Sequence, residues 1–259
     1  MSNPIKIAID AMGGDNSPDK VIEGISIHSF SSKNIIYKLF GNKSLIEPLI
    51  SKYKIKNEIV EITHTENFVD GKDSALSAAK KGKNTSLWLS IECLKNNNAD
   101  AIVSAGNTGA LFVIAKLNLN MINNIDKPAL AGLWPNKNGM NVVLDLGANI
   151  ECNEKNLEDF SIMGSAFRKA LYENEVAKVA LLNIGSEELK GNIIIKNTYQ
   201  KLNEKKNPLF EFHGYIEGNN IMEGKINVIV TDGFTGNVAL KTAEGTSNFI
   251  VKELKKAMT

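Results

Sequence analysis

The feature that most constrains the fold is a change of pattern between residues 99 and 115. Residues 101–103 form a short apolar run typical of a buried parallel strand, and residues 110–115 have the character of a buried helix start. Between them lies a polar turn, residues 104–109, that contains two glycines. A strand, a tight turn and a helix make half of a β-α-β unit, so the sequence predicts an α/β fold with a parallel sheet.

The same order of elements occurs near both ends of the chain. Towards the C-terminus, a strand is predicted at 226–230, a polar turn with two glycines at 231–237 and a helix from residue 238. At the N-terminus, a strand at 5–9 leads into a glycine turn and then a helix that begins near Pro18. The repetition indicates a doubly wound arrangement of strands and helices.

Further strands and helices complete the prediction. The additional strands are expected at residues 37–40, 59–62, 129–134, 141–144, 179–182 and 210–212. The additional helices are expected at residues 44–53, from 74, from 85 or 86 to 94, from 110 to 125, and 157–171. No linker or composition break separates them, so we predict one domain over residues 1–259 with a helical lobe around residues 65–95.

Five predicted strands end in an aspartate or asparagine close to a glycine. These residues are Asp10, Asn107, Asp145, Asn183 and Asp232. In an open parallel sheet the carboxyl ends of the strands line one edge, and ligands bind in the crevice there. Glycines allow close backbone approach, and the first turn of each following helix offers unpaired N–H groups to an anion. The alternative is that the polar residues only cap their helices.

Composition places the chain among ordinary globular proteins, with 43% hydrophobic and 23% charged residues. The net charge of +1 does not point to nucleic acid, and we expect no nucleic-acid partner. Two cysteines do not make a disulfide framework, which fits a reducing cytoplasm. No signal pattern and no run of ~18 apolar residues is present, so we expect a cytoplasmic protein without a spanning helix.

Several common catalytic and nucleotide-binding motifs are missing from the sequence. No G-x-G-x-x-G follows the first strand, and no G-x-x-x-x-G-K-[ST] occurs. H-E-x-x-H, C-x-x-C and G-x-S-x-G are also absent. These absences disfavour a standard dinucleotide site, a Walker-type site and a serine hydrolase.

Five motifs together resemble the PlsX family, the phosphate acyltransferases of bacterial phospholipid synthesis. They are IAIDAMGGD (7–15), SAGNTGAL (104–111), LDLGAN (144–149), NIGSEELKG (183–191) and DGFTGNVALK (232–241). The resemblance runs in order from about residue 5 to 245. It implies a Rossmann-like three-layer α/β/α fold with a mostly parallel sheet, related to isocitrate dehydrogenase and phosphotransacetylase, and usually a homodimer.

The resemblance also implies the reaction, in which acyl-[acyl-carrier protein] and inorganic phosphate give acyl phosphate and free carrier protein. No cofactor and no metal site are expected. Members of the family continue past residue 259 with more helices, among them an amphipathic element that touches the membrane. This chain ends inside an amphipathic helix with Phe249, Ile250, Leu254 and Ala257 on one side. The expectation is therefore a peripheral contact at the inner face of the cell membrane.

The motifs assign the candidate site residues. We predict Asn107, Lys190, Asp232 and Asn237 as catalytic residues. The predicted substrate-binding residues are Asp10, Gly13, Gly14, Ser104, Gly106, Thr108, Gly109, Asp145, Asn149, Thr235, Gly236 and Lys241. Residues 104–109 would hold phosphate with the 235–237 turn facing them, and Lys190 would supply positive charge. The aspartates would repel bare phosphate, so they are expected to accept from loop N–H groups or to hold a divalent cation.

Alternative interpretations remain at this point. Three carboxylates at strand ends also suit a metal-dependent decarboxylating dehydrogenase on a related fold, and a truncated chain could be a non-catalytic remnant that binds the carrier. The histidines and Cys93 are expected to be structural, and nothing beside Cys152 indicates a lowered pKa. Lysine runs at residues 80–83 and 205–206 could meet an acidic carrier protein.

Overall fold

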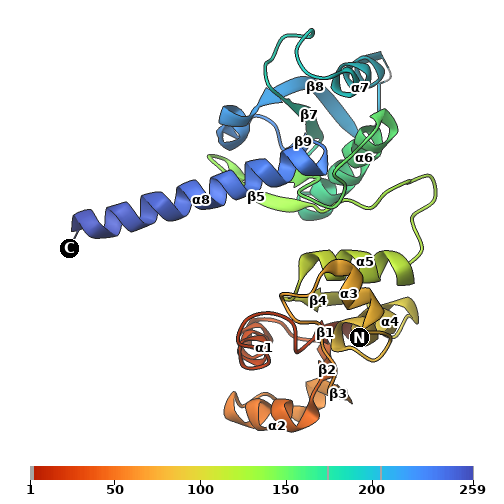
Figure 1. Ribbon diagram of the computed structural model, residues 1–259, viewed down its shortest axis with the longest axis vertical. Coiled ribbons are helices and arrows are strands. Elements are labelled where there is room, and N and C mark those ends of the chain that lie inside the picture. The colour runs from red at the N-terminus through yellow and green to blue at the C-terminus, as the bar shows by residue number, and fades with distance from the viewer. Residues whose placement is uncertain (1–2, 174, 205, 259) are drawn as a thin grey trace. The chain divides into compact units, whose positions relative to one another are not determined.

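The computed structural model describes residues 3–173, 175–204 and 206–258. The chain divides into two compact units, Met1–Asn120 and Met121–Thr259, and each has its own sheet (Figure 1). The α/β fold class with mostly parallel strands is confirmed. That residues 1–259 act as one domain with a helical lobe at 65–95 remains a prediction.

The sheet of the first unit has four parallel strands in the order β3-β2-β1-β4. Their bounds are Ile5–Asp10 for β1, Ile35–Gly41 for β2, Val60–His64 for β3 and Ala101–Ser104 for β4. The helices are Asp19–Ser31 (α1), Lys43–Lys52 (α2), Asn57–Ile59 (η1), Ala75–Lys80 (α3), Ser86–Lys95 (α4) and Thr108–Asn118 (α5).

Alternation along the strands sorts the core of the first unit into two faces. Ile9 and Leu39 point towards α1 and α2, where they pack with Ile22. Their neighbours Ala8 and Phe40 point to the opposite face, which α4 covers. A period of two residues in the strands therefore produces three layers, helices, sheet and helices (Figure 1).

The sheet of the second unit has five strands in the order β5-β6-β9-β7-β8, and only β5 runs antiparallel to its neighbour. The bounds are Gly132–Asn136 (β5), Gly139–Leu144 (β6), Ala177–Asn183 (β7), Phe210–Glu217 (β8) and Val228–Val230 (β9). The helices are Glu154–Leu171 (α6), Ile193–Glu204 (α7), Gly218–Glu223 (η2) and Gly233–Met258 (α8).

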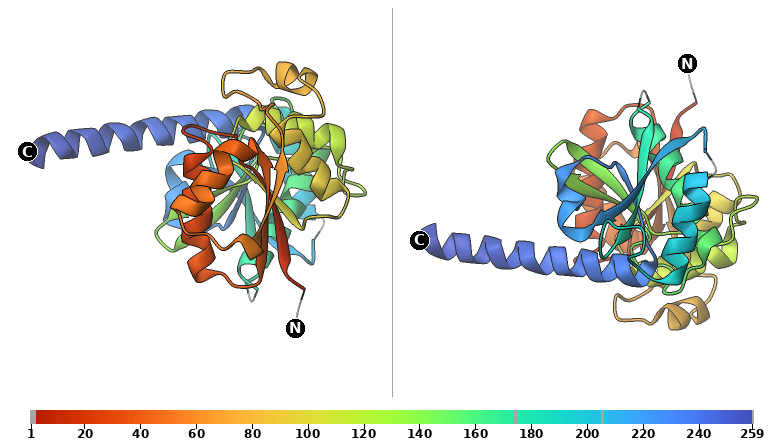
Figure 2. Two further views of the ribbon diagram at one scale, coloured as in Figure 1. Left: turned by 90° about the horizontal axis from the view of Figure 1, so that it is seen from below. Right: turned by 90° about the horizontal axis from the view of Figure 1, so that it is seen from above.

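The second unit is also layered. Leu144, Leu181 and Val230 pack against α6 and α7 on one face of the sheet. The other face is covered by the beginning of α8, where Leu240 and Ala243 meet the core. The later part of α8 projects beyond this sheet, and all its residues from 244 to 258 are exposed (Figure 2). Among the described residues, no helix has both the length and the hydropathy of a membrane span.

Several elements differ from the sequence prediction. The helix expected at 110–125 is α5, which starts at Thr108 because Asn107 caps it and which ends at Asn118, where Leu119 turns extended. The helix expected from 238 starts at Gly233. Helix α7 was missed, although Ile195, Thr198 and Leu202 have helical spacing and are buried. β8 continues through residues 213–217, which the sequence analysis left outside a strand.

Candidate active site

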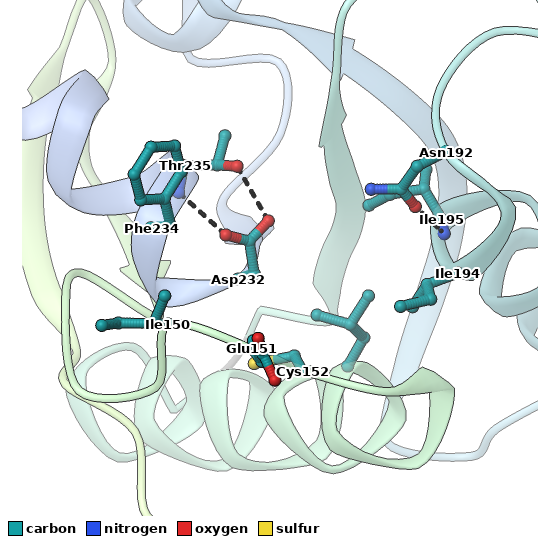
Figure 3. A pocket seen from close by; sticks show the side chains of 10 residues that line it. Ile150, Glu151, Cys152, Asn192, Ile194, Ile195, Asp232, Phe234 and Thr235 are labelled. Carbon is teal, nitrogen blue, oxygen red and sulfur yellow. Dashed lines mark hydrogen bonds between the residues drawn. The ribbon is translucent and has the colours of Figure 1, made fainter.

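A cavity of about 440 Å³ lies at the carboxyl ends of β6, β7 and β9 in the second unit. Three loops surround it, each running from one of these strands to the start of the next helix. Its lining residues are Ile150, Glu151, Cys152, Leu157, Asn192, Ile194, Ile195, Asp232, Phe234 and Thr235 (Figure 3). This is the edge at which ligands bind in parallel sheets.

Asp232 caps the first turn of α8. Its two carboxylate oxygens accept from the backbone N–H and the hydroxyl of Thr235, both at 2.8 Å (Figure 3). Aspartate is favoured at a helix N-terminus because its side chain satisfies an otherwise unpaired N–H group. The predicted turn residues Thr235, Gly236 and Asn237 therefore lie within the helix.

The first turn of α8 rests directly on the loop after β6. A Cβ atom on Gly236 would lie 1.9 Å from the Asp145 carbonyl oxygen, and one on Gly233 would lie 2.5 Å from that of Asn149. The Gly233 N–H donates to this Asn149 oxygen at 2.8 Å. The glycines thus allow close packing of backbone on backbone. This packing is a structural reason for glycine at positions that were predicted to bind substrate.

Asp145 and Asn149 hold that loop in shape. The buried Asp145 carboxylate accepts from the backbone N–H groups of Leu130, Gly147 and Ala148 at one oxygen. Its other oxygen accepts from the backbone and side-chain amides of Asn149, both at 2.7 Å. Both side chains point into the loop, so they position the site and do not line the cavity.

The start of α7 brings hydrogen-bond donors to the cavity. Asn192 accepts from the Ile195 N–H at 2.9 Å and so caps the helix. In the described part of the chain, the N–H groups of Ile193 and Ile194 have no partner, as is expected in a first helical turn. The Asn183 side chain shapes the preceding loop by donating to the carbonyl oxygens of Gly185 and Lys190, both at 3.1 Å.

The predicted cations differ in their surroundings. Lys190 is exposed and, among the described residues, its ammonium group has no ion-pair partner. Lys241 forms a 2.7 Å ion pair with Glu244 on the exposed face of α8. Asn237 is exposed near Gly147, where a Cβ atom would lie 3.6 Å from its side-chain oxygen. Lys190 is therefore the cation that remains available to a ligand.

Cys152 brings a thiol to the cavity lining. The thiol is buried and donates to the Asn149 carbonyl oxygen at 3.7 Å. Burial raises the pKa of Cys152, so the protonated form predominates at neutral pH. The thiol is thus poorly suited to nucleophilic attack.

In the first unit, Asp10 joins the ends of β1 and β4. Its carboxylate accepts from the hydroxyls of Ser86 at 2.6 Å and Ser104 at 2.8 Å. Ser104 also accepts from the Gly106 N–H at 3.1 Å. All three aspartates at strand ends thus accept hydrogen bonds from protein donors, as the repulsion argument predicted.

Gly13 and Gly14 pack against the loop after β4. A Cβ atom on Gly13 would lie 2.4 Å from an Asp10 oxygen, and one on Gly14 would lie 2.5 Å from the Ala105 carbonyl oxygen. Gly14 also has a φ of 96°, which disfavours other residues. These glycines are required by loop packing within the first unit.

Asn107 connects α5 to the segment before α3. Its side-chain oxygen accepts from the Ala110 N–H at 3.0 Å, and its amide donates to the carbonyl oxygens of Gly71 and Asp73. The side chain predicted as catalytic is therefore fully engaged in structure. Among the described residues, the N–H groups of Thr108 and Gly109 remain without partners at the start of α5.

The buried Asp10 gives a pH-dependent prediction. Burial raises its pKa despite the hydrogen bonds from Ser86 and Ser104, which lower it. Its contribution to stability is therefore fully present below the ordinary pKa of 3.8 and is lost as the pH rises through the raised value. Asp10→Asn keeps a similar shape without a charge, so its stability relative to the wild type should increase with pH over this window.

Denaturant unfolding at a series of pH values tests this, with Trp88 fluorescence as the signal from the first unit and Trp134 replaced by phenylalanine. Asp15→Asn, on the same loop, is the matched control, because Asp15 is exposed whereas Asp10 is buried. Parallel stability profiles for Asp10→Asn and the wild type would contradict the interpretation.

The five polar turns divide between two sheets. Those at Asp10 and Asn107 belong to the first unit, and those at Asp145, Asn183 and Asp232 belong to the second. The expectation of a single sheet edge that carries all five is therefore wrong. The reason is that β4 pairs only with β1, whereas β6 begins a second set of paired strands.

The structure also shows residues that the sequence analysis missed. Ile150, Leu157, Ile194 and Phe234 line the cavity, although apolar residues in loops and first turns were read as core or ignored. Phe234 lies inside the DGFTGN motif. The signal available in the sequence was an aromatic residue between the two glycines of a polar turn.

The remaining candidates have structural surroundings. His28 contacts the Tyr37 hydroxyl and Ser32, and His64 accepts from the Lys43 N–H. Lys81 pairs with Asp73, while Lys205 lies outside the described residues. Over the ranges that the structure describes, no three His, Cys, Asp or Glu side chains form a group suited to a metal ion.

Solved structures with a similar fold support the fold assignment. A phosphotransacetylase from Streptococcus pyogenes matches with a TM-score of 0.67 and 15% identity over 94% of this chain and 82% of its own. EutD phosphotransacetylase from Staphylococcus aureus matches with a TM-score of 0.64 and 16% identity over 95% and 83%. The chain therefore has the α/β fold seen in phosphotransacetylases.

Sequence comparison identifies the family. The family model described as "Fatty acid synthesis protein" matches residues 5–259, and the chain belongs to this family. A phosphate acyltransferase of Pelagibacter ubique is 63% identical over all of this chain and 77% of its own length. One of Paramagnetospirillum magneticum is 42% identical over 99% of this chain and 73% of its own length.

Proposed function

We propose that this protein is a phosphate acyltransferase that converts acyl-[acyl-carrier protein] and inorganic phosphate to acyl phosphate and free carrier protein. The observation that carries the proposal is the 63% identity, over the whole chain, to a relative named phosphate acyltransferase. The cavity at the carboxyl edge of the second sheet supplies a site for it. The product feeds phospholipid synthesis.

The reaction needs little help from a protein nucleophile. A phosphate oxygen attacks the thioester carbonyl, a C–O bond forms, and the C–S bond breaks to release the thiolate of the carrier. That thiolate leaves readily because the pKa of a thiol is only about 8.5, and it then takes a proton from water. The protein must supply position and charge stabilisation, to which orientation alone contributes ~7 kcal/mol or more.

In the proposed site, phosphate binds at the first turn of α7. The donors are the Ile193 and Ile194 N–H groups, the Asn192 amide and the ammonium group of Lys190. Helix N-termini favour anions because their N–H groups and dipole both point at the ligand. Asp232 tolerates this charge because Thr235 donates twice to its carboxylate. Asn237 is proposed to contact the substrate carbonyl.

Two further proposals concern the first unit. The unpaired N–H groups of Thr108 and Gly109 remain our prediction for an additional phosphate contact. The lysine run at residues 80–83 is proposed to meet the acidic carrier protein, with an affinity that decreases as salt increases. We also propose a cytoplasmic homodimer with a peripheral membrane contact, for which the exposed Phe249 and Leu254 of α8 provide apolar surface.

Replacing Lys190 by glutamine should raise the KM for phosphate about tenfold or more, since a hydrogen bond to a charged group is worth about 1.5–3 kcal/mol. Lys241→Gln is the matched control, because Glu244 already pairs with that lysine. Initial rates over a range of phosphate concentrations measure both. An equal effect of the two substitutions would remove Lys190 from the proposed site.

Replacing Cys152 by alanine should leave most of the acyl transfer activity, because the buried thiol is protonated and forms no acyl-enzyme. Intact-mass spectrometry of a quenched reaction should find no acylated protein. A fall in kcat of about a hundredfold together with an acyl adduct on wild type would establish a covalent route instead.

The proposed function is tested by incubating the protein with acyl-carrier protein that bears a palmitoyl thioester, with and without inorganic phosphate. Hydroxylamine then traps acyl phosphate as a hydroxamate. We expect hydroxamate that depends on phosphate and forms in the presence of a chelator. Activity that is lost with the chelator would favour the metal-dependent alternative, which the full-length relatives do not favour.

A further inference from the structure

The cavity is much larger than a phosphate ion, and part of its lining is apolar. Its volume of about 440 Å³ falls in the range of ligand pockets, whereas a phosphate ion displaces on the order of four waters, about 120 Å³. Ile150 from the loop after β6, Leu157 from α6, Ile194 from α7 and Phe234 from α8 supply apolar side chains. Most of the space therefore faces hydrocarbon.

Of the polar groups that line the cavity, Asp232 and Cys152 already have protein partners, and Glu151 adds a carboxylate that disfavours a second anion. Thr235 satisfies Asp232, and the Cys152 thiol already donates to the Asn149 carbonyl oxygen. In the described lining no lysine or arginine is present. A neutral, apolar group is therefore the chemistry that best fits the side of the cavity away from α7.

Phe234 and Ile150 stand out at the mouth of this cavity. They are 63% and 72% exposed, although both are large hydrophobic residues. In Figure 3 they lie on the same side of Asp232, opposite Ile194. Exposed apolar side chains that border a cavity mark a surface to be covered by a ligand.

We propose that Phe234 and Ile150 hold the later carbons of the acyl chain, where it leaves the cavity, and thereby make the enzyme favour long over short acyl chains. This inference rests on the proposed function. The chain would run from the thioester carbonyl near Thr235 and leave the cavity between these two side chains, on the side away from α7. Phe234 and Ile150 are thus specificity residues and take no part in bond making.

The test compares Phe234→Ala with Phe30→Ala, because Phe30 is likewise a helical phenylalanine and is 82% exposed. Rates are measured with butanoyl- and palmitoyl-carrier protein. For Phe234→Ala, kcat/KM should fall about tenfold or more with palmitoyl and about twofold or less with butanoyl substrate, with an unchanged KM for phosphate. Phe234→Leu should recover most of the loss, and Phe30→Ala should change neither rate.

A binding measurement separates this inference from the proposed function. A fluorescent fatty acid is titrated into the wild-type protein and into both variants in the absence of phosphate. Weaker binding by Phe234→Ala alone supports the acyl site, even if the wild type were to form no acyl phosphate. Equal losses with short and long substrates, or unchanged binding of the fatty acid, would overturn it while leaving the phosphate acyltransferase activity in place.

Discussion

Replacing Asp145 by asparagine is expected to lower the free energy of unfolding of the second unit by about 3–5 kcal/mol. Both oxygens of this buried carboxylate accept from N–H groups. An asparagine would place an NH2 group where one of those oxygens stands, so the N–H groups that donate to that oxygen would face another hydrogen-bond donor. The backbone N–H groups left without an acceptor cannot reach water, and each costs about 1–3 kcal/mol.

Denaturant unfolding followed by Trp134 fluorescence, in a Trp88→Phe background, measures the second unit alone. Asp232→Asn is the matched control, because asparagine caps a helix about as well as aspartate. It should change stability by only about 0.5 kcal/mol while altering acyl transfer. If Asp145→Asn were as stable as Asp232→Asn, the loop would not depend on the carboxylate in the way the hydrogen bonds indicate.

Replacing Gly236 by alanine should destabilise the second unit by more than about 3 kcal/mol and abolish acyl transfer. The added Cβ would lie 1.9 Å from the Asp145 carbonyl oxygen and 2.9 Å from a Thr231 methyl carbon. The Asp145 oxygen belongs to backbone that the loop holds in place, so α8 would have to move. That movement would also displace Asp232 and Phe234.

Gly245→Ala provides the control on the same helix. Nothing lies within 4 Å of a Cβ atom at that position, so the change should leave stability unaltered or raise it by up to about 1 kcal/mol. The same Trp134 unfolding measurement applies to both variants. Equal stabilities would show that the contact of α8 with the β6 loop can relax without cost.

Local patterns were sufficient for most of the strands and for the turns that follow them. Apolar runs such as residues 5–9 and 179–182 coincide with β1 and β7, because burial on both faces leaves few other residue types available. The capping residues Ser74 and Thr85 were also predictable, since their side chains act on N–H groups three residues away. Such signals depend only on residues close in the sequence, so the sequence alone is enough to predict them.

The division into two sheets could not be predicted in the same way. Whether a strand pairs with one distant strand or another depends on contacts that no short window contains. The sequence also cannot show whether Ser104 and Asn107, polar residues at a strand end, face a ligand or a neighbouring loop. The structure shows that both are hydrogen-bonded to protein groups. Phe234 is an aromatic residue in a polar turn, and only the structure shows that it lies exposed at the cavity.

The most direct test of the proposed site is a titration of inorganic phosphate into the isotopically labelled protein, followed by amide NMR shifts. We predict saturable shifts at Ile193, Ile194 and Phe234, whose N–H groups lie at the first turns of α7 and α8. Lys190→Gln should weaken phosphate binding, so that these shifts saturate at a higher phosphate concentration. Shifts confined to Thr108 and Gly109, or none that saturate, would contradict a phosphate site at the carboxyl edge of the second sheet.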